Sequence, residues 1–340
     1  MKRPAPPGRF GQQVKTHREV HDMMPIRKIA AGAAMALALG AAPALADYPD
    51  RPITMLVPFS AGGGTDITAR TVSQFLEREI GGTITVVNRP GAGGEIALSE
   101  LAESAPDGYT LGIINTPGIV TIPISREARF STDSFDFLAG VVEDPATISV
   151  LESSPIQSIE DLVAAARERP GQITVATQGV GSAGHISLLL LEQAADVTFR
   201  PVPYSGAADG RTALLSGDVE ATTANLGEAL TFAEGNPWRT LGVKSTGRSP
   251  MAPDLPTFAE AGYPIIGGSL RGFGGPAGMP EEAVEMLAEA LERIIADPEF
   301  QRVAEETNQP LRFVSRDDYI DFLAQSRRMH EELWAVNPWQ

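Results

Sequence analysis

The chain contains no cysteine, which excludes disulfides, thiolate metal sites and a cysteine nucleophile. Histidine is also scarce, because only His185 and His330 lie beyond residue 46, so a histidine-rich metal site is not expected. No other cofactor is expected. After residue 46, no segment approaches the ~20 apolar residues that a membrane-spanning helix needs. Because there are no disulfides, side-chain packing alone must stabilise the core.

Basic residues are few relative to acidic ones. The 340 residues include 27 Lys+Arg and 43 Asp+Glu, a net charge of -16. Seven of the bases and two of the acids lie within residues 1–46, which leaves 20 basic and 41 acidic residues, a net charge of -21, in the rest. Such a surface is a poor partner for nucleic acid. The remaining chain is long enough for two domains, and 43% hydrophobic residues can fill both cores.

The N-terminus predicts export. A basic pair at residues 27–28 precedes an apolar, alanine-rich run over 29–45, and the small residues that end this run predict cleavage by signal peptidase after Ala46. The stretch before Met24 is polar and unlike a signal peptide, which favours either Met24 as the true start or an unusually long leader. Residues 1–46 are therefore expected to be a leader with a signal peptide, outside the fold.

Two glycine-rich loops carry the strongest functional signal. Ser60–Asp66 (SAGGGTD) follows the apolar run Ile53–Phe59, and Gly179–His185 (GVGSAGH) follows Ile173–Gln178. A helical pattern follows each loop, so free backbone N–H groups at the helix start should point into the loop, and glycine lets a ligand approach the backbone. If the loops face each other, they would hold a small anion, most simply a carboxylate, from both sides.

Strand and helix patterns alternate along the rest of the chain. Alternation of this kind predicts an α/β fold with parallel sheets and crossover helices, in which ligands bind at the carboxyl ends of the strands. The further expected strands are 83–88, 109–115, 148–151, 199–204, 219–225 and 241–245, and the expected helices are 67–79, 95–104, one beginning at Ser158, 186–195, 211–215, 281–295 and 317–336.

Short motifs along the mature chain, in order and spacing, resemble the periplasmic substrate-binding proteins of tripartite tricarboxylate transporters, the Bug family. Each motif alone is weak, but the ordered set covers essentially all of the chain after residue 46. The motifs are YPDRPI at 48–53, VPF at 57–59 with Gly62, Gly63 and Asp66, NRPGAGG at 88–94, PDGYTL at 106–111, GVGS at 179–182 with His185, VPYSG at 202–206, LLSG at 214–217 and PAG at 276–278 with Pro280.

The resemblance implies a two-lobed periplasmic-binding-protein fold (Venus-flytrap, type II-like) with a ligand cleft between the lobes. Lobe 1 would comprise residues 47–146 plus 268–340, and lobe 2 residues 147–267. The implied function is that of a monomeric periplasmic solute-binding protein, not an enzyme, which captures a small carboxylate and delivers it to a transporter with one large and one small integral membrane subunit. The alternative is a receptor that presents its closed form to a sensor kinase.

The resemblance also implies the residues that hold the ligand, through backbone amides and small hydroxyls. From the loops these are Ser60, Ala61, Gly62, Gly63, Thr65, Asp66, Gly181, Ser182 and Ala183. His185 follows in the second loop, and Thr116, Tyr204 and Asn225, with Asn115, stand at strand ends. Several of these have structural alternatives. Asp66 is more typical of a helix cap than of a ligand contact, and His185 of a packed side chain. Tyr204 suits a turn and a ligand contact equally well, and Thr65 and Ser182 suit capping and binding about equally.

Arg271 departs from the pattern of many family members, which place an aromatic residue before the glycine of this segment. Arginine can bind a carboxylate through two parallel hydrogen bonds, so Arg271 suggests a ligand with more than one carboxylate, in keeping with the tricarboxylate-binding subgroup. The alternative is that Arg271 pairs with an acidic residue on the surface or bridges the hinge.

Enzymatic motifs are incomplete. Val180 occupies the first glycine position of a Gly-x-Ser-x-Gly nucleophile elbow around Ser182. The first glycine loop lacks the Gly-Lys-Ser/Thr of a phosphate loop, and Ile96 stands where a dinucleotide fingerprint needs its third glycine. ATP and NAD are therefore not expected ligands.

Overall fold

The computed structural model describes residues 48–339, and the expected leader, with Met24 and the cleavage site after Ala46, lies outside them. The chain divides into two units, residues 1–46 and 47–340, of which the second is described below. Within the described residues, no helix is both long and apolar enough to cross a membrane.

The fold begins with parallel strand–helix–strand units. β1 (Ile53–Val57) is apolar and almost fully buried, and it pairs in parallel with β2 (Ile84–Asn88) on one side and β3 (Thr110–Asn115) on the other. α2 (Gly64–Ile80) and α3 (Glu95–Ala102) are the crossovers. All five elements lie within three residues of their expected bounds, because each has a strong local hydrophobic pattern and a glycine or polar turn at its ends.

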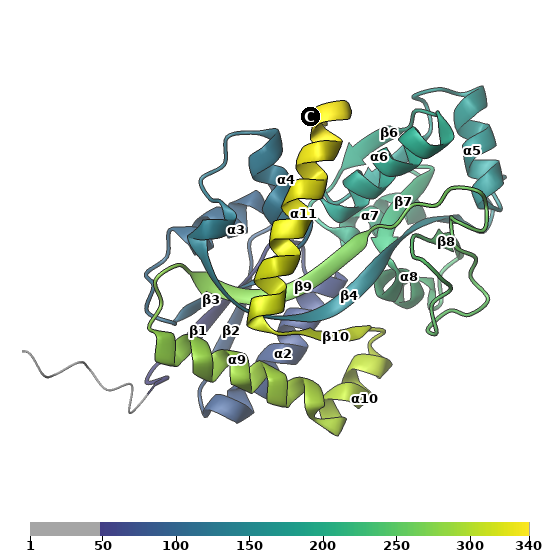
Figure 1. Cartoon of the computed structure of the whole chain (residues 1–340). Coiled ribbons are helices and arrows are strands. Elements are labelled where there is room, and N and C mark those ends of the chain that lie inside the picture. The colour runs from purple at the N-terminus through teal and green to yellow at the C-terminus, as the bar shows by residue number, and fades with distance from the viewer. Residues whose placement is uncertain (1–47, 340) are drawn as a thin grey trace, which may run out of the picture. The chain divides into compact units, whose positions relative to one another are not determined.

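The C-terminal third of the chain returns to the same sheet. β9 (Gly268–Pro276) lies between β3 and β4 (Phe135–Leu151) and is antiparallel to both. The long final helix crosses the molecule beside these strands (Figure 1). The other elements of this half are α4 (Gly118–Ser125), α9 (Glu281–Ala296), α10 (Pro298–Glu306), β10 (Leu311–Val314) and α11 (Arg316–Val336), with 3-10 turns at Ala92–Gly94 and Thr132–Ser134.

The middle of the chain builds the second half. β5 (Thr174–Thr177) pairs in parallel with β6 (Arg200–Pro203) and β7 (Ala221–Asn225), so that the second glycine loop, after β5, lies at the carboxyl end of its strand, as the first loop does after β1. The remaining elements are α5 (Ile159–Glu168), α6 (Ala183–Ala195), α7 (Ala207–Ser216), α8 (Leu226–Ala233) and β8 (Trp238–Val243).

β4 joins the two halves. From Phe135 to Pro145 it pairs with β9, and from Ala146 to Leu151 it pairs with β7 and β8. The chain crosses back at Gly267, whose carbonyl accepts the N–H of Ala146 at 2.7 Å. We propose lobe boundaries at these two crossings, 47–146 plus 268–340 and 147–267, because the strand pairing changes partners there.

The expectation of parallel sheets is confirmed for the pairs formed by β1 and β5 and wrong for those formed by β4 and β9. The strands form one mixed path, β2-β1-β3-β9-β4-β7-β5-β6, in which all pairings of β4 and β9 are antiparallel. The reason is that the chain passes between the halves as extended strand, without a crossover helix. The sequence patterns also missed α4, α8, α10, β9, β10 and β4 before residue 148.

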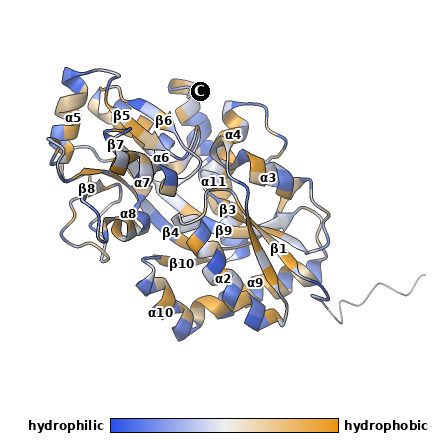
Figure 2. Cartoon of the chain, turned by 180° about the vertical axis from the view of Figure 1, so that it is seen from behind, coloured by the Kyte–Doolittle hydropathy of each residue, from blue (hydrophilic) through white to orange (hydrophobic). Residues whose placement is uncertain are grey.

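Each half has its own core. One cluster joins β3, α4 and β4 with the end of the chain through residues such as Ile114, Ile119 and Leu323, and a second joins β4, α5 and α6 through residues such as Leu162 and Leu188. Figure 2 shows apolar strands such as β1 inside the layers of helices, whose outer faces carry polar residues. The cores hold the two glycine loops at the ends of rigid strands.

Candidate functional site

The first glycine loop is tied down by Asp66. The Asp66 carboxylate, 4% exposed, accepts hydrogen bonds from the Gly62 N–H at 2.9 Å, from Arg70 Nε at 3.0 Å and from Asn88 Nδ2 at 2.9 Å. Burial raises the pKa of Asp66, but the bonds from Arg70, Gly62 and Asn88 outweigh it and hold the pKa below its usual value. Asp66 thus anchors the loop from the first turn of α2, while the cap position is held by Gly63, which provides no capping side chain.

The second glycine loop is closed by a similar local network. Ser182 caps α6, and its hydroxyl accepts the His185 N–H at 3.3 Å. The Nδ1 atom of His185 accepts the Gly181 N–H at 3.2 Å, so the ring faces its own loop. Burial lowers the pKa of His185 to about 4, and the imidazole is therefore neutral near pH 7. In this structure His185 packs within the protein, which was the structural alternative for it.

The two loops lie on opposite sides of one cleft, and the lobes are in contact across it. Thr121 Oγ1, in the first half, donates to the Gly181 carbonyl at 2.6 Å. Ser60 donates from its N–H to the Ser205 carbonyl at 3.2 Å and from its hydroxyl to Asp209 Oδ2 at 2.6 Å. These bonds join segments from the two halves, so the structure is that of a closed form.

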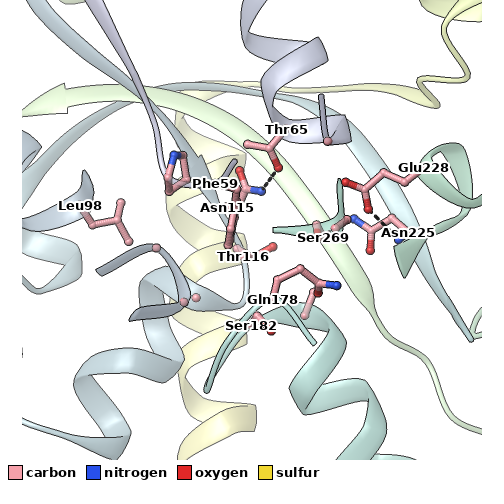
Figure 3. A pocket seen from close by; sticks show the side chains of 17 residues that line it. Phe59, Thr65, Leu98, Asn115, Thr116, Gln178, Ser182, Asn225, Glu228 and Ser269 are labelled. Carbon is pink, nitrogen blue, oxygen red and sulfur yellow. Dashed lines mark hydrogen bonds between the residues drawn. The ribbon is translucent and has the colours of Figure 1, made fainter. Parts of the chain in front are cut away.

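A small cavity of ≈ 40 Å³ remains between the loops. Figure 3 shows Thr65 and Asn115 on one side, Gln178 and Ser182 on the opposite side, and Leu98 and Glu228 at opposite ends. The lining is polar at the Glu228 end and apolar near Leu98. It consists of Pro58, Phe59, Gly63, Thr65, Gly93, Gly94, Leu98, Asn115, Thr116, Gly118, Gln178, Ser182, Ala183, Ala207, Asn225, Glu228 and Ser269.

Hydrogen-bonding groups in the cavity wall are left without protein partners. Within residues 48–339, the N–H groups of two lining residues, Thr65 at the start of α2 and Ala183 at the start of α6, have no protein acceptor, and neither has that of Gly184, which follows Ala183 but does not line the cavity. Asn115 donates through Nδ2 to Thr65 Oγ1 at 2.8 Å, but its buried Oδ1 accepts no hydrogen bond. The wall therefore offers both donors and an acceptor to a bound molecule.

Glu228 is the one ionisable side chain among the lining residues, and sequence reasoning missed it. Its Oε1 accepts the Gly64 N–H at 2.7 Å, across the cleft at the start of α2, and its Oε2 accepts the Asn225 N–H at 2.9 Å. The spacing of Asn225 and Glu228, typical of a helix N-terminus, was the available signal. It predicts a cap for α8 but not the contact with Gly64, which lies far away in the sequence.

Arg271 lies behind the cavity wall and is not part of the lining. Its guanidinium, 1% exposed, pairs with Asp144 Oδ2 at 3.0 Å and lies 3.9 Å from Glu228 Oε1. Burial raises the pKa of Asp144 to about 6; Arg271 opposes this rise, and Glu228 adds to it. The site therefore differs from the expectation of direct ligand contact for Arg271, because the guanidinium is engaged by two buried carboxylates of β4 and α8.

The expected site residues divide into two groups. Seven line the cavity: Gly63, Thr65, Asn115, Thr116, Ser182, Ala183 and Asn225. The others do not line it but support or border it, namely Ser60, Ala61, Gly62, Asp66, Gly181, His185, Tyr204 and Arg271. Tyr204 packs on the apolar cluster beneath β5 and α7, as a residue entering a turn would. Gln178, Ser269 and the pair Gly93 and Gly94 were not expected in the wall, because only the tertiary fold brings them there.

A larger groove of ≈ 740 Å³ lies next to the cavity, on the side of α11. Thr116, Ala183 and Ser269 line both spaces and therefore separate them. The groove is largely apolar, whereas the smaller cavity lies between the two glycine loops and carries the unpaired hydrogen-bonding groups, so the smaller one is the better candidate site for an anion. Among residues 48–339, no three His, Asp or Glu side chains are grouped to hold a metal ion.

Comparison with known proteins agrees with the family resemblance of the sequence motifs. The family described as "Tripartite tricarboxylate transporter family receptor" matches residues 68–333. Protein BugT of Bordetella pertussis is 34% identical over 228 residues, covering 66% of this chain and 70% of BugT.

Two solved structures are similar over most of the chain. The structure described as "R. palustris Rpa4515 with adipate" has a TM-score of 0.81 and 30% identity, and covers 85% of this chain and 98% of its own. MatC from Rhodopseudomonas palustris with bound malate has a TM-score of 0.78 and 25% identity, with coverages of 84% and 99%. The chain therefore belongs to the tripartite tricarboxylate transporter receptor family, the Bug family, and has the two-lobed α/β fold of periplasmic binding proteins.

Proposed function

We propose that this protein captures a small carboxylate between its lobes in the periplasm and delivers it, in the closed form, to a tripartite membrane transporter with one large and one small membrane subunit. The observation that carries the proposal is the meeting of two helix N-termini, α2 and α6, from opposite lobes at one enclosed cavity. Unpaired N–H groups and the partial positive charge of a helix N-terminus both favour an anion.

The relatives support the choice of ligand class. Rpa4515 was solved with adipate and MatC with malate, which are both carboxylates. In this chain, the N–H groups of Ala183 and Gly184 and the hydroxyls of Thr65, Ser182 and Ser269 can donate to a carboxylate. These groups come from both lobes, so the ligand gains contacts on closure that the open form cannot provide.

The proposed mechanism is capture followed by closure, as a monomer. Ligand binds to one lobe, and the second loop then completes its hydrogen bonds. The bonds of Thr121 to Gly181 and of Ser60 to Asp209 add to the closed state. Closure thereby buries the ligand and creates the surface that the membrane subunits would recognise.

Thermal unfolding tests the proposal. The chain from Asp47 onward, unfolded and refolded to remove bound ligand, is melted with a panel of mono-, di- and tricarboxylates. A carboxylate at ~100 times its Kd should stabilise the protein by ~2.7 kcal/mol, visible as a rise in Tm. The neutral amide of each acid, such as adipamide for adipate, is the matched control and should give no shift. Absence of a shift with every carboxylate would refute the proposal.

A further inference from the structure

We propose that the ligand carries a cationic or strongly hydrogen-bond-donating group, such as a protonated amine, in addition to its carboxylate, and that Glu228 and the Asn115 amide oxygen receive this group. This inference rests on the proposed carboxylate-binding function and narrows its ligand class. It selects amino-substituted acids over plain di- and tricarboxylates.

The charge of the cavity wall is the first argument. No basic side chain is among the lining residues, and Glu228 is their one ionisable group. Behind it, a single cation, Arg271, faces two carboxylates, those of Asp144 at 3.0 Å and Glu228 at 3.9 Å. Glu228 also accepts the N–H groups of Gly64 and Asn225, so its charge takes up the N-terminus of α2 and leaves that of α6 for an anion. With all three groups ionised the buried cluster carries one net negative charge, which favours a cation over an anion at the Glu228 end of the cavity.

The second argument is an acceptor without a donor. Asn115 is 9% exposed, and its Nδ2 is fixed by the hydrogen bond to Thr65 Oγ1 at 2.8 Å. Its Oδ1 is therefore held in one orientation, and it is buried with no partner among the described residues. An unpaired buried acceptor is costly, and a ligand donor placed there removes that cost.

Apart from the Thr65 N–H, the free backbone donors lie elsewhere in the cavity. The free N–H groups of Ala183 and Gly184 and the Ser182 hydroxyl belong to the start of α6. Figure 3 shows Ser182 on the wall opposite Thr65 and Asn115, with Glu228 at one end. The wall therefore receives a carboxylate on the α6 side and a donor on the side of Asn115 and Glu228. A plain dicarboxylate would place one carboxylate on the α6 side, but its second carboxylate would then lie near Glu228.

Matched pairs of ligands test this with the unaltered protein. The refolded chain is titrated by calorimetry with adipate and 2-aminoadipate, and with malate and aspartate, which carry a hydroxyl and an ammonium on the same carbon. If another acid of the panel binds best, its α-amino analogue completes a third pair. Hydrogen bonds to a charged group predict that the amino acid of the binding pair has a Kd about tenfold lower or better.

The outcomes separate the two proposals. Equal or tighter binding of the plain acid overturns this inference and leaves the carboxylate-binding function intact. A complete lack of binding by all acids, plain and amino-substituted, refutes the function and this inference with it.

Glu228→Gln identifies the residue responsible. The amide keeps the size of the side chain and an acceptor for Gly64 but removes the charge, so the preference for the amino acid should fall to less than about threefold. Glu220→Gln is the control. Glu220 does not line the cavity, and its carboxylate forms an ion pair with Arg169 at 2.7 Å, so this variant should keep the full preference for the amino acid. An undiminished preference in Glu228→Gln would exclude Glu228. If that variant does not fold, the ligand pairs with the unaltered protein still decide.

Discussion

At the scale of single residues, one buried cation controls the charge behind the cavity. Arg271 and Asp144 are each 1% exposed, and Glu228 is 9% exposed. Two carboxylates without their cation would be left in a low-dielectric environment, where an unpaired charge is strongly unfavourable. Arg271 therefore has a structural task that differs from the bidentate ligand contact expected from the sequence.

Replacing this cation should destabilise the whole fold. Arg271→Met is expected to lower the free energy of unfolding by about 3–5 kcal/mol, because Asp144 and Glu228 lose their partner. Urea denaturation measures the change. Arg293→Met is the matched control: Arg293 pairs with Glu79 at 2.9 Å but is 51% exposed, so its loss should cost about 1 kcal/mol or less. Equal losses in the two variants would contradict the assigned role of Arg271.

At the scale of elements, glycines let the two lobes touch. A methyl group on Gly93 would lie 2.6 Å from the carbonyl oxygen of Val180, and one on Gly179 would lie 2.7 Å from the Gly93 N–H nitrogen. Gly93 also has φ 71° and Gly179 φ 103°, which favour glycine. The contact belongs to the closed form, so a side chain at either position should obstruct closure.

Gly93→Ala should therefore weaken ligand binding, in addition to the loss of stability that any side chain causes at a positive φ. We expect the Kd of the tightest panel carboxylate to rise about tenfold or more, which corresponds to about 1.4 kcal/mol. Gly81→Ala is the control, since Gly81 has φ 69° but open space around it, so it has the backbone strain without the clash. Both variants should lose about 1–2 kcal/mol of stability from strain. Unchanged affinity in Gly93→Ala would mean that this contact is not needed for binding.

The sequence predicted features formed by neighbouring residues and missed contacts between residues far apart in the chain. The strand, glycine loop and helix of each anion-binding unit lie within about 30 consecutive residues, so hydrophobic period and turn chemistry locate them. Glu228 meets Gly64 across 164 positions, and Asn115 meets Thr65 across 50. No local pattern carries those contacts. For the same reason the antiparallel β9, whose partners are distant in the sequence, was not predicted.

At the scale of the whole molecule, the closed structure requires an open one. The cavity of ≈ 40 Å³ is lined from both lobes and has room for little more than water, so a carboxylate such as adipate can be taken up only when the lobes separate. We propose that the chain bends where it passes between the halves, near Pro145 in β4 and near Gly267 before β9, because the strand pairing changes partners there. The large groove shares Thr116 and Ser269 with the cavity, so motion about these crossings should change the groove as well.

Closure can be measured directly, because the cysteine-free chain accepts spin labels at chosen sites. Gln74→Cys on α2 and Thr212→Cys on α7 place one label on an exposed position of each lobe. Without ligand, pulsed electron resonance should show a broad distribution of long distances between the two labels. The carboxylate with the largest Tm shift should convert it to a single shorter distance, since only the closed form provides both loops.

The control is a pair of labels within lobe 1, Gln74→Cys with Glu282→Cys, whose distance should not change. If a stabilising ligand left the distance between the lobes unchanged, binding would not require closure, and the contacts between Ser60, Asp209, Thr121 and Gly181 would have to exist in the free protein as well.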